Sequence, residues 1–162
     1  MLKSIFIEIK WALLFVVMTL LWMVMERYAG LHDRNIHQHA IYTNFIAIPA
    51  ILLYIFALLD KRNNFYNGTM NYKQGFISGA IITLIVTLFS PLTQWITSTF
   101  ITPHFFENVT KYVVEQKLMT EVAAKNYFNL KSFLIQATIG AAVMGTATSA
   151  IVAIFTRGKK EA

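Results

Sequence analysis

The chain contains no cysteine and few charged residues. Without cysteine, disulfides, thiolate metal sites and cysteine-based catalysis are all excluded. Charged residues make up 14% of the 162 residues, whereas a typical soluble domain has about 25%. Hydrophobic residues make up 56%, and the few charges stand in short clusters between long uncharged stretches. This distribution excludes a soluble globular domain.

The sequence also lacks the short motifs that mark common active sites. It has no G-x-S-x-G, no Walker-type phosphate loop, no H-E-x-x-H and no Gly-rich dinucleotide fingerprint. The formal net charge is +6, but no run of Lys and Arg interleaved with aromatics indicates a nucleic-acid surface. In a membrane protein such an excess is typical of loops beside anionic lipid. We therefore expect no enzymatic activity, no cofactor and no nucleic-acid partner.

Four apolar segments approach the length of about 20 residues that a helix needs to cross a hydrocarbon core of about 30 Å. They predict spans at about 5–25, 41–59, 75–100 and 132–156. A cleaved signal peptide is the less favoured interpretation of the first segment, because no A-x-A-like site follows it. Pro49 and Pro91 predict kinks in the second and third spans. The predicted fold is a single all-α membrane domain, a bundle of four transmembrane helices with an amphipathic segment between spans three and four.

The placement of Lys and Arg predicts the orientation. Basic residues abut two span ends directly, in Asp60-Lys61-Arg62 and in Arg157-Gly158-Lys159-Lys160. With both termini inside, the inner segments carry the larger basic share: Lys3, Lys10, Lys61, Arg62, Lys73, Arg157, Lys159 and Lys160. The outer segments carry Arg27, Arg34, Lys111, Lys117, Lys125 and Lys131. We expect cytoplasmic N- and C-termini in a bacterial inner membrane.

The longest loop, about 102–130, has the pattern of one or two amphipathic helices. Thr102 followed by Pro103 is typical of a helix start, and a break is expected near Met119-Thr120. The segment either rests on the outer membrane surface as a solvated helix or presents a docking surface for a partner. Apolar residues recur on one face at Phe105, Val109, Tyr112 and Val113, and charges alternate in sign at spacing four from Glu107 to Glu115 and from Lys117 to Lys125.

Small residues form rows on the last two spans. In lipid such rows permit the close backbone approach that holds helices together. We therefore predict that the third and fourth spans cross closely, and the fourth-span row is also a candidate contact for a second copy or another subunit. The row on the third span is Gly75, Gly79, Thr83 and Thr87, and the row on the fourth is Ala137, Ala141, Gly145, Ser149 and Ala153.

Polar residues inside the spans are few, and Gln94 and Gln136 are the main ones. They could hydrogen-bond across the bundle or line a small outward cavity. No ionisable residue is expected in the middle of a span, which counts against a proton-coupled transporter.

The loop after the first span is rich in histidine. His32, Asp33, His37 and His39 lie within eight residues, and His104 in the other outer loop is a further candidate. Imidazole and carboxylate groups are zinc ligands, but the spacing matches no specific zinc motif. A metal site, a pH-sensitive loop and an ordinary solvated loop all remain open, and the last is favoured.

Several short stretches carry a resemblance to a known family. They are Glu26-Arg27-Tyr28-Ala29-Gly30-Leu31-His32, then Tyr72-Lys73-Gln74-Gly75-Phe76 with Gly79, and Ile101-Thr102-Pro103-His104-Phe105. With them the chain resembles small bacterial inner-membrane proteins described as domain of unknown function 4199, over nearly its whole length. Thr102 and His104 replace an Asn and an acid of the family pattern. The resemblance implies the four-span architecture and no activity.

Three functions follow as hypotheses. The first is a non-enzymatic accessory or scaffold subunit that binds another membrane protein or itself within the lipid bilayer. The second is a small oligomeric transporter or channel lined by Gln94, Gln136 and the Thr-rich third span. The third is an interfacial lipid-modifying enzyme with Glu26, His32, Asp33 or His104 at the outer interface. The first is favoured because no catalytic constellation is evident.

Overall fold

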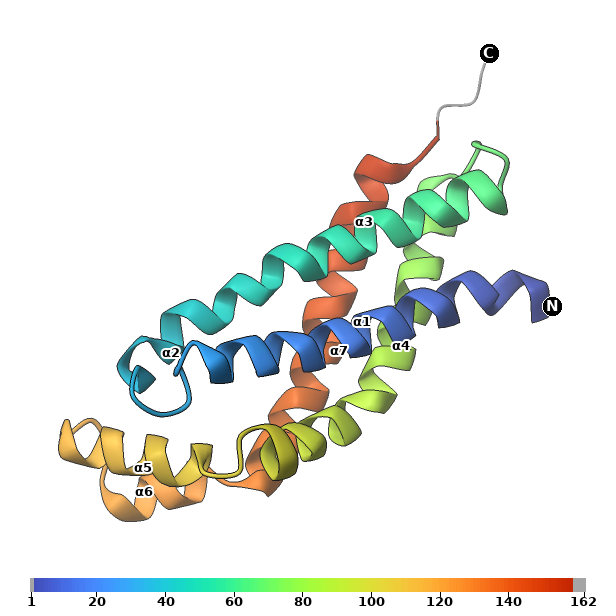
Figure 1. Cartoon of the computed structure of the whole chain (residues 1–162). Coiled ribbons are helices and arrows are strands. Elements are labelled where there is room, and N and C mark those ends of the chain that lie inside the picture. The colour runs from blue at the N-terminus through green and yellow to red at the C-terminus, as the bar shows by residue number, and fades with distance from the viewer. Residues whose placement is uncertain (1, 159–162) are drawn as a thin grey trace.

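The computed structural model describes residues 2–158, with side chains from residue 5 onward (Figure 1). Of the charges that predict the orientation, the side chain of Lys3 and the residues Lys159, Lys160 and Glu161 lie outside this part. Regular structure in the described residues is helical throughout. In chain order the helices are α1 (Leu2–Tyr28), α2 (Ile36–Tyr42), η1 (Thr43–Ile46), α3 (Ala47–Asn64), α4 (Tyr72–Ile96), η2 (Thr97–Ile101), α5 (Phe105–Glu115), α6 (Glu121–Tyr127) and α7 (Leu130–Thr156).

Four helical stretches have the length and apolarity to cross a membrane, which confirms the predicted fold class. They are Ile5–Tyr28, Ile36–Asn64, Tyr72–Ile101 and Leu130–Thr156. The second begins well before the predicted residue 41, because α2, η1 and α3 follow one another without a loop. The polar residues that were assigned to a loop therefore include the first turn of a helix.

The two prolines within spans have different local effects. Pro49 lies just inside α3, and the turn before it is the 3-10 helix η1. Because proline has no N–H to bond the carbonyl four residues earlier, this turn loses an α-helical bond and tightens. Pro91 lies inside α4, which bends along its length and ends in the π-helical turn η2 (Figure 1). The Thr87 carbonyl, which the missing N–H of Pro91 cannot bond, instead accepts the Ser90 hydroxyl at 2.8 Å.

The core of the bundle lies where α4 and α7 run against each other, with α1 and α3 packed alongside. Its largest buried side chains include Leu58, Met70 and Ile82, with Tyr54 from α3 also buried. The α3–α4 connection is tight, since Asn67 and Gly68 both have positive φ. Asn71 and Gln74 then form a reciprocal capping box that starts α4.

The segment between the last two spans forms a helical hairpin, α5 and α6. Phe105, Val109 and Val113 are buried and face Ala124 of α6 in a second apolar cluster. The predicted break lies at residues 116–120, and Thr120 caps α6 by accepting from the Ala123 N–H. The helix start predicted at Thr102 is wrong, because α5 begins at Phe105 and the Thr102 hydroxyl instead donates to the Thr97 carbonyl, 3.2 Å away. That bond completes the end of the preceding π-turn.

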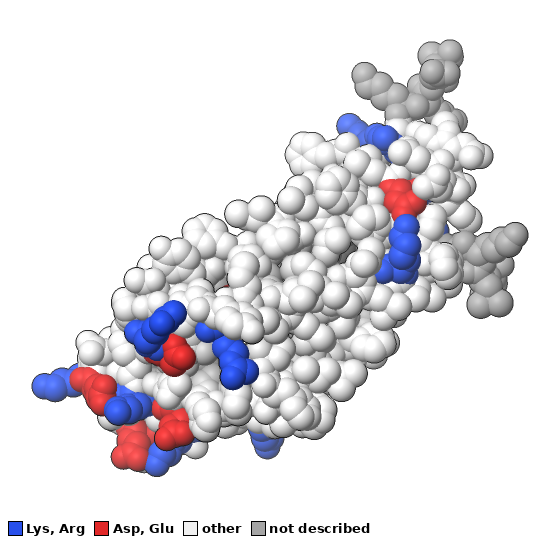
Figure 2. Space-filling view, viewed as in Figure 1, with Lys and Arg blue, Asp and Glu red and all other residues white. Residues whose placement is uncertain are grey.

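Charged side chains gather at the two ends of the molecule, with an uncharged zone between them on the face that Figure 2 shows. One end, the turn end, holds the start of α1, the α3–α4 connection and the end of α7 (Figure 1). The other, the hairpin end, holds α2, α5 and α6. Large apolar side chains between the ends are exposed, for example Leu88 at 71% and Val143 at 60%. Such a surface is stable only in lipid, so the chain is a multi-pass membrane protein.

Candidate functional site: an acid and two imidazoles at the hairpin end

The end of α1 is shaped by Gly30. Its φ of +74° is the left-handed conformation that glycine adopts at low cost. The Gly30 N–H donates to the Arg27 carbonyl at 2.9 Å, and the Leu31 N–H donates to the Glu26 carbonyl at 3.0 Å. These two bonds are those of a Schellman motif, with Leu31 buried as its apolar contact. The motif reverses the chain and returns the next residue, His32, over the last turn of α1.

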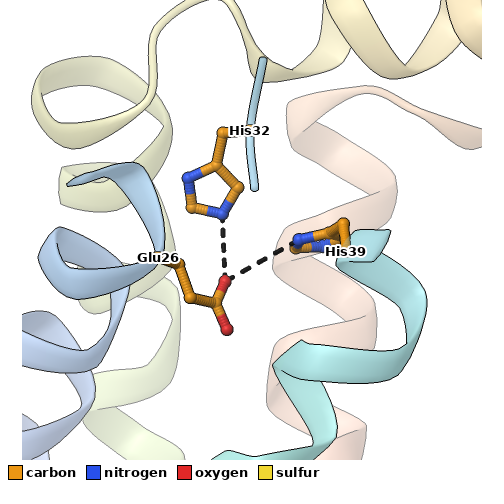
Figure 3. Close-up of side chains that lie close together, drawn as sticks. All are labelled: Glu26, His32 and His39. Carbon is orange, nitrogen blue, oxygen red and sulfur yellow. Dashed lines mark hydrogen bonds and ion pairs between the residues drawn. The ribbon is translucent and has the colours of Figure 1, made fainter. Parts of the chain in front are cut away.

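Glu26, His32 and His39 converge at this reversal. His32 Nε2 lies 3.0 Å from Glu26 Oε2, and His39 Nδ1 lies 3.7 Å from the same oxygen. Figure 3 shows both rings turned toward the carboxylate, one from the loop and one from α2. One oxygen of a single acid therefore receives two imidazoles from different parts of the chain.

The cluster is enclosed by protein. Glu26 is 1% exposed and His32 is 7% exposed. Phe105 of α5 lies against both rings, with centroids 5.2 Å from His32 and 4.9 Å from His39. The Trp22 indole N–H donates to Glu26 Oε1, one turn earlier on α1. The hairpin thus forms the wall of the site, and α1 supports the carboxylate from below.

The chemistry available to the cluster follows from its donors. A buried carboxylate is stable only when paired or hydrogen-bonded, and two imidazoles provide that in either of two ways. They can donate N–H bonds to Glu26, or all three can present lone pairs to one cation. Within the described residues, these three side chains are the group of acids and histidines whose ligand atoms lie within 4.8 Å of one another.

The other candidates of the histidine-rich loop do not join the cluster. His37 is exposed on α2, and Asp33 is exposed, with its carboxylate accepting from the Arg34 N–H. His104 is exposed and lies 3.7 Å from Glu107. Asp33 and His104 do line a shallow surface pocket of about 320 Å³, which His32 also borders.

Sequence reasoning grouped the histidines by their position along the chain and named Glu26 with them only as a possible group of an interfacial enzyme, not as a partner of His39. Arg27 donates to the Ile101 carbonyl at 2.5 Å, at the C-terminal end of η2. The signal that Glu26 would meet His32 was Gly30, because a glycine just past a helix predicts a chain reversal.

The small residues of α4 and α7 meet along the half of their crossing near the turn end. A Cβ built on Gly79 would lie 2.7 Å from Ser149 Cβ, and one on Gly145 would lie 2.6 Å from Thr83 Cγ2. A Cβ on Gly75 would lie 3.4 Å from that of Ala153. Backbones this close leave no room for larger side chains.

The same two rows diverge toward the hairpin end. Ala137 and Ala141 border a cavity of about 160 Å³ between α1, α4 and α7. Gln94 also lines this cavity and donates to the Ser98 hydroxyl at 2.9 Å. Thr87 is half-buried, and its hydroxyl oxygen has no hydrogen-bond partner. Gln136 faces outward and accepts from the Tyr127 hydroxyl at 3.2 Å, so the two glutamines do not meet.

A buried ion pair lies at the turn end and was not foreseen. Lys61 Nζ is 2.8 Å from Glu8 Oε1, and both residues are 2% exposed. The Ser78 hydroxyl donates to the same carboxylate oxygen at 2.8 Å, and the ammonium lies 4.0 Å from the ring centre of Phe65. Sequence reasoning counted Lys61 among the basic residues of the inner segments and did not pair it with Glu8. A lone acid within the apolar run Ile5–Ile9 was the available signal.

Comparison with known proteins identifies the family and nothing finer. The family model "Protein of unknown function (DUF4199)" matches residues 10–158. No curated protein and no solved structure shows a significant match to the chain.

Proposed function

From the premise that this chain belongs to the DUF4199 family, whose function is unknown, we propose that it is a non-enzymatic accessory subunit that binds another membrane protein. We place it in a bacterial cytoplasmic membrane with both termini in the cytoplasm. The turn end is then cytoplasmic, and the hairpin end lies on the outer side. The single observation that carries the proposal is the second apolar surface of the α5–α6 hairpin.

The hairpin exposes some of its apolar side chains and buries others. One face of α5 packs inward through Phe105, Val109 and Val113. Leu118, in the connection between α5 and α6, is 65% exposed, and Val122 of α6 is 72% exposed. The hairpin also carries a groove of about 530 Å³ whose lining mixes apolar and charged residues: Phe106, Glu107, Thr110, Lys111, Val114, Glu115, Glu121, Lys125 and Phe128. Exposed apolar surface outside a membrane span is unfavourable in water, and such surface commonly marks a contact with another protein or with lipid.

The charges of the hairpin favour a protein over lipid as the contact of this exposed surface. Helices that lie on an anionic membrane surface are rich in Lys and Arg on their polar face. Here acids and bases alternate, and pairs form within the hairpin, such as Lys125 to Glu121 at 2.6 Å. A surface of balanced sign gains little from anionic head groups and suits a partner with its own mixed charges.

The interior supports an accessory role over a pore. Between α4 and α7 the Thr83 hydroxyl, 2.8 Å from that of Tyr54, and the buried Ser149 fill the crossing near the turn end. Gln136, one of the side chains expected to line a path, faces outward. A transporter would therefore have to form its path between copies of the chain.

Co-purification tests the proposal directly. The tagged protein is extracted from its native membrane in mild detergent, and the associated proteins are identified and quantified by mass spectrometry. We expect a membrane protein at a fixed ratio that is lost when Leu118→Gln and Val122→Gln are combined. Lys117→Gln, in the same connection, removes a charge but no apolar area and should retain it. Recovery of the chain alone, or equal recovery with both variants, would refute the proposal.

The orientation has a separate test, which the absence of cysteine makes simple. Single cysteines replace Asn67 in the α3–α4 connection and Val122 in the hairpin, and intact cells are treated with a membrane-impermeant maleimide. The proposal expects labelling at position 122 and protection at position 67 until the cells are broken. The opposite pattern would invert the topology.

A further inference from the structure

We propose that Glu26, His32 and His39 bind one divalent transition-metal ion of the zinc class at the hairpin end. The inference is independent of the partner proposed above. It rests on the donor set, the spacing of the donor atoms and the enclosure of the cluster by three separate segments.

The donor set suits such an ion. Two imidazole nitrogens and one carboxylate oxygen form a ligand set used by zinc, which is borderline in softness, and oxygen-only cations such as Mg²⁺ and Ca²⁺ rarely take imidazole. Three protein ligands leave a fourth tetrahedral position for water or another small ligand. One carboxylate charge offsets part of the charge of the ion, and the low exposure of Glu26 keeps water from competing for that oxygen.

The spacing is close to that of a formed site. With metal–ligand distances near 2.1 Å, two ligands of a tetrahedral ion lie about 3.4 Å apart. The two distances to Glu26 Oε2, 3.0 Å from His32 and 3.7 Å from His39, bracket this value. The remaining pair of donors is within 4.8 Å. Each imidazole has two rotatable side-chain bonds through which its nitrogen can approach an ion.

The surroundings hold the ligands in place. Glu26 Oε1 accepts the Trp22 indole N–H, which leaves Oε2 for the ion. The Asn108 amide donates to the His32 carbonyl at 2.9 Å, so α5 fixes the loop that carries this ligand. Phe105 contacts both rings from one side. Groups that orient ligands in this way typically change metal affinity by about 10–100-fold when they are removed.

The ring nitrogens support the assignment further. His32 Nδ1 and His39 Nδ1 are buried and have no hydrogen-bond partner. A buried polar atom without a partner is costly, and a metal ion would satisfy His39 Nδ1 directly. With an ion on His32 Nε2, that ring carries its proton on Nδ1, and His32 borders the pocket that Asp33 and His104 also line.

The alternative is a hydrogen-bonded cluster without an ion, in which the imidazoles donate to Glu26. Both arrangements use the same residues, so a stability measurement alone would not separate them. They differ in metal binding, since only the first gives one ion per chain and a coordination spectrum.

The experiment uses Co²⁺ as a spectroscopic probe and Zn²⁺ as a competitor. The full-length protein, purified in mild detergent and stripped with a chelator, is titrated with Co²⁺, and visible absorption and bound metal per chain are measured. We expect one Co²⁺ per chain with the strong absorption of a four-coordinate ion, displaced by Zn²⁺. Glu26→Gln and His39→Ala should each weaken binding by about tenfold or more.

His37→Ala is the matched control, because His37 lies two residues before His39 on α2 but is exposed. It should bind Co²⁺ as the native chain does. Far-UV circular dichroism and gel filtration of each variant establish that a loss of binding is not a loss of folding. If Glu26→Gln does not fold, His39→Ala and His39→Gln decide the matter alone. No binding to the native chain, binding that survives both His39 variants, or binding lost in His37→Ala would each overturn the proposal.

Discussion

A single methyl group at Gly145 should be enough to separate α4 from α7. In Gly145→Ala the new Cβ would lie 2.6 Å from Thr83 Cγ2, 2.8 Å from Thr83 Oγ1 and 2.9 Å from the Tyr54 hydroxyl. The last two of these groups, the hydroxyls of Thr83 and Tyr54, are hydrogen-bonded to each other at 2.8 Å. The variant must either separate the helices or break this bond.

The expected magnitude follows from two opposing effects. Overpacking a well-filled site costs about 1–3 kcal/mol. Alanine in place of glycine within a helix raises the free energy of unfolding by about 0.5–1 kcal/mol. The net loss in the free energy of unfolding should then be centred on about 1 kcal/mol and reach at most about 2.5 kcal/mol. Gly140→Ala, five residues earlier on α7, is the matched control because nothing lies within 4 Å of its built Cβ. It should be neutral or slightly stabilising.

The assay is unfolding in mild detergent by added sodium dodecyl sulfate, followed by tryptophan fluorescence and circular dichroism. Thr83→Ser removes the nearest methyl and should recover part of the loss in the Gly145→Ala background. If Gly145→Ala and Gly140→Ala unfold at the same midpoint, close backbone approach does not hold α4 against α7, and the argument from the small residues fails.

Two further predictions concern ion pairs of opposite burial. Glu8→Gln keeps an acceptor for the Ser78 hydroxyl but removes the carboxylate that lies 2.8 Å from Lys61 Nζ. Loss of this charged hydrogen bond should lower the free energy of unfolding in the same assay by about 1.5–3 kcal/mol; an unchanged midpoint would contradict a stabilising role for the pair. Glu121 is fully exposed, and its hydrogen bond to Lys125, with the charge of that ammonium, lowers the pKa of Glu121 below its ordinary 4.5. Because the folded pKa is the lower one, this contact stabilises α6 above the unfolded pKa and is lost as the pH falls through the folded value. NMR titration of the Glu121 carboxyl should show the lowered pKa, and Lys125→Gln should return it to the ordinary value; equal pKa values in both would contradict the contact.

Hydropathy alone was sufficient to predict the four spans and the fold class, because in lipid each span must satisfy its backbone internally as a helix. The break between α5 and α6 was also predictable, since Thr120 is a good helix cap that follows an apolar face. The early start of the second span was not predictable from apolar content. Its first turn carries His37 and His39, and a hydropathy window counts such residues as loop.

The candidate site was only partly predictable, for a related reason. The histidines were recognised as possible ligands, but proximity in sequence does not select which of them share a site. Glu26 and His39 are brought together by the reversal at Gly30 and by the helical phase of α2, which turns His39 inward and leaves His37 exposed. Phase is set by where a helix begins, and helix boundaries are the weakest part of any reading from sequence.

The two buried acids of α1, Glu8 and Glu26, lie on the same face of this helix at opposite ends of the molecule. Glu8 and Glu26 are eighteen residues apart, which is five turns of helix and about 27 Å, so they share one face. Their partners Lys61 and His39 are twenty-two residues apart on the second span, and each contacts an acid of α1. The second span therefore carries one partner for each acid, at 2.8 Å for Lys61 and 3.7 Å for His39. Apolar faces in lipid discriminate poorly between registers. A slip of one turn, about 5.4 Å, would break both contacts at once, so these two pairs fix how α1 is aligned against the second span.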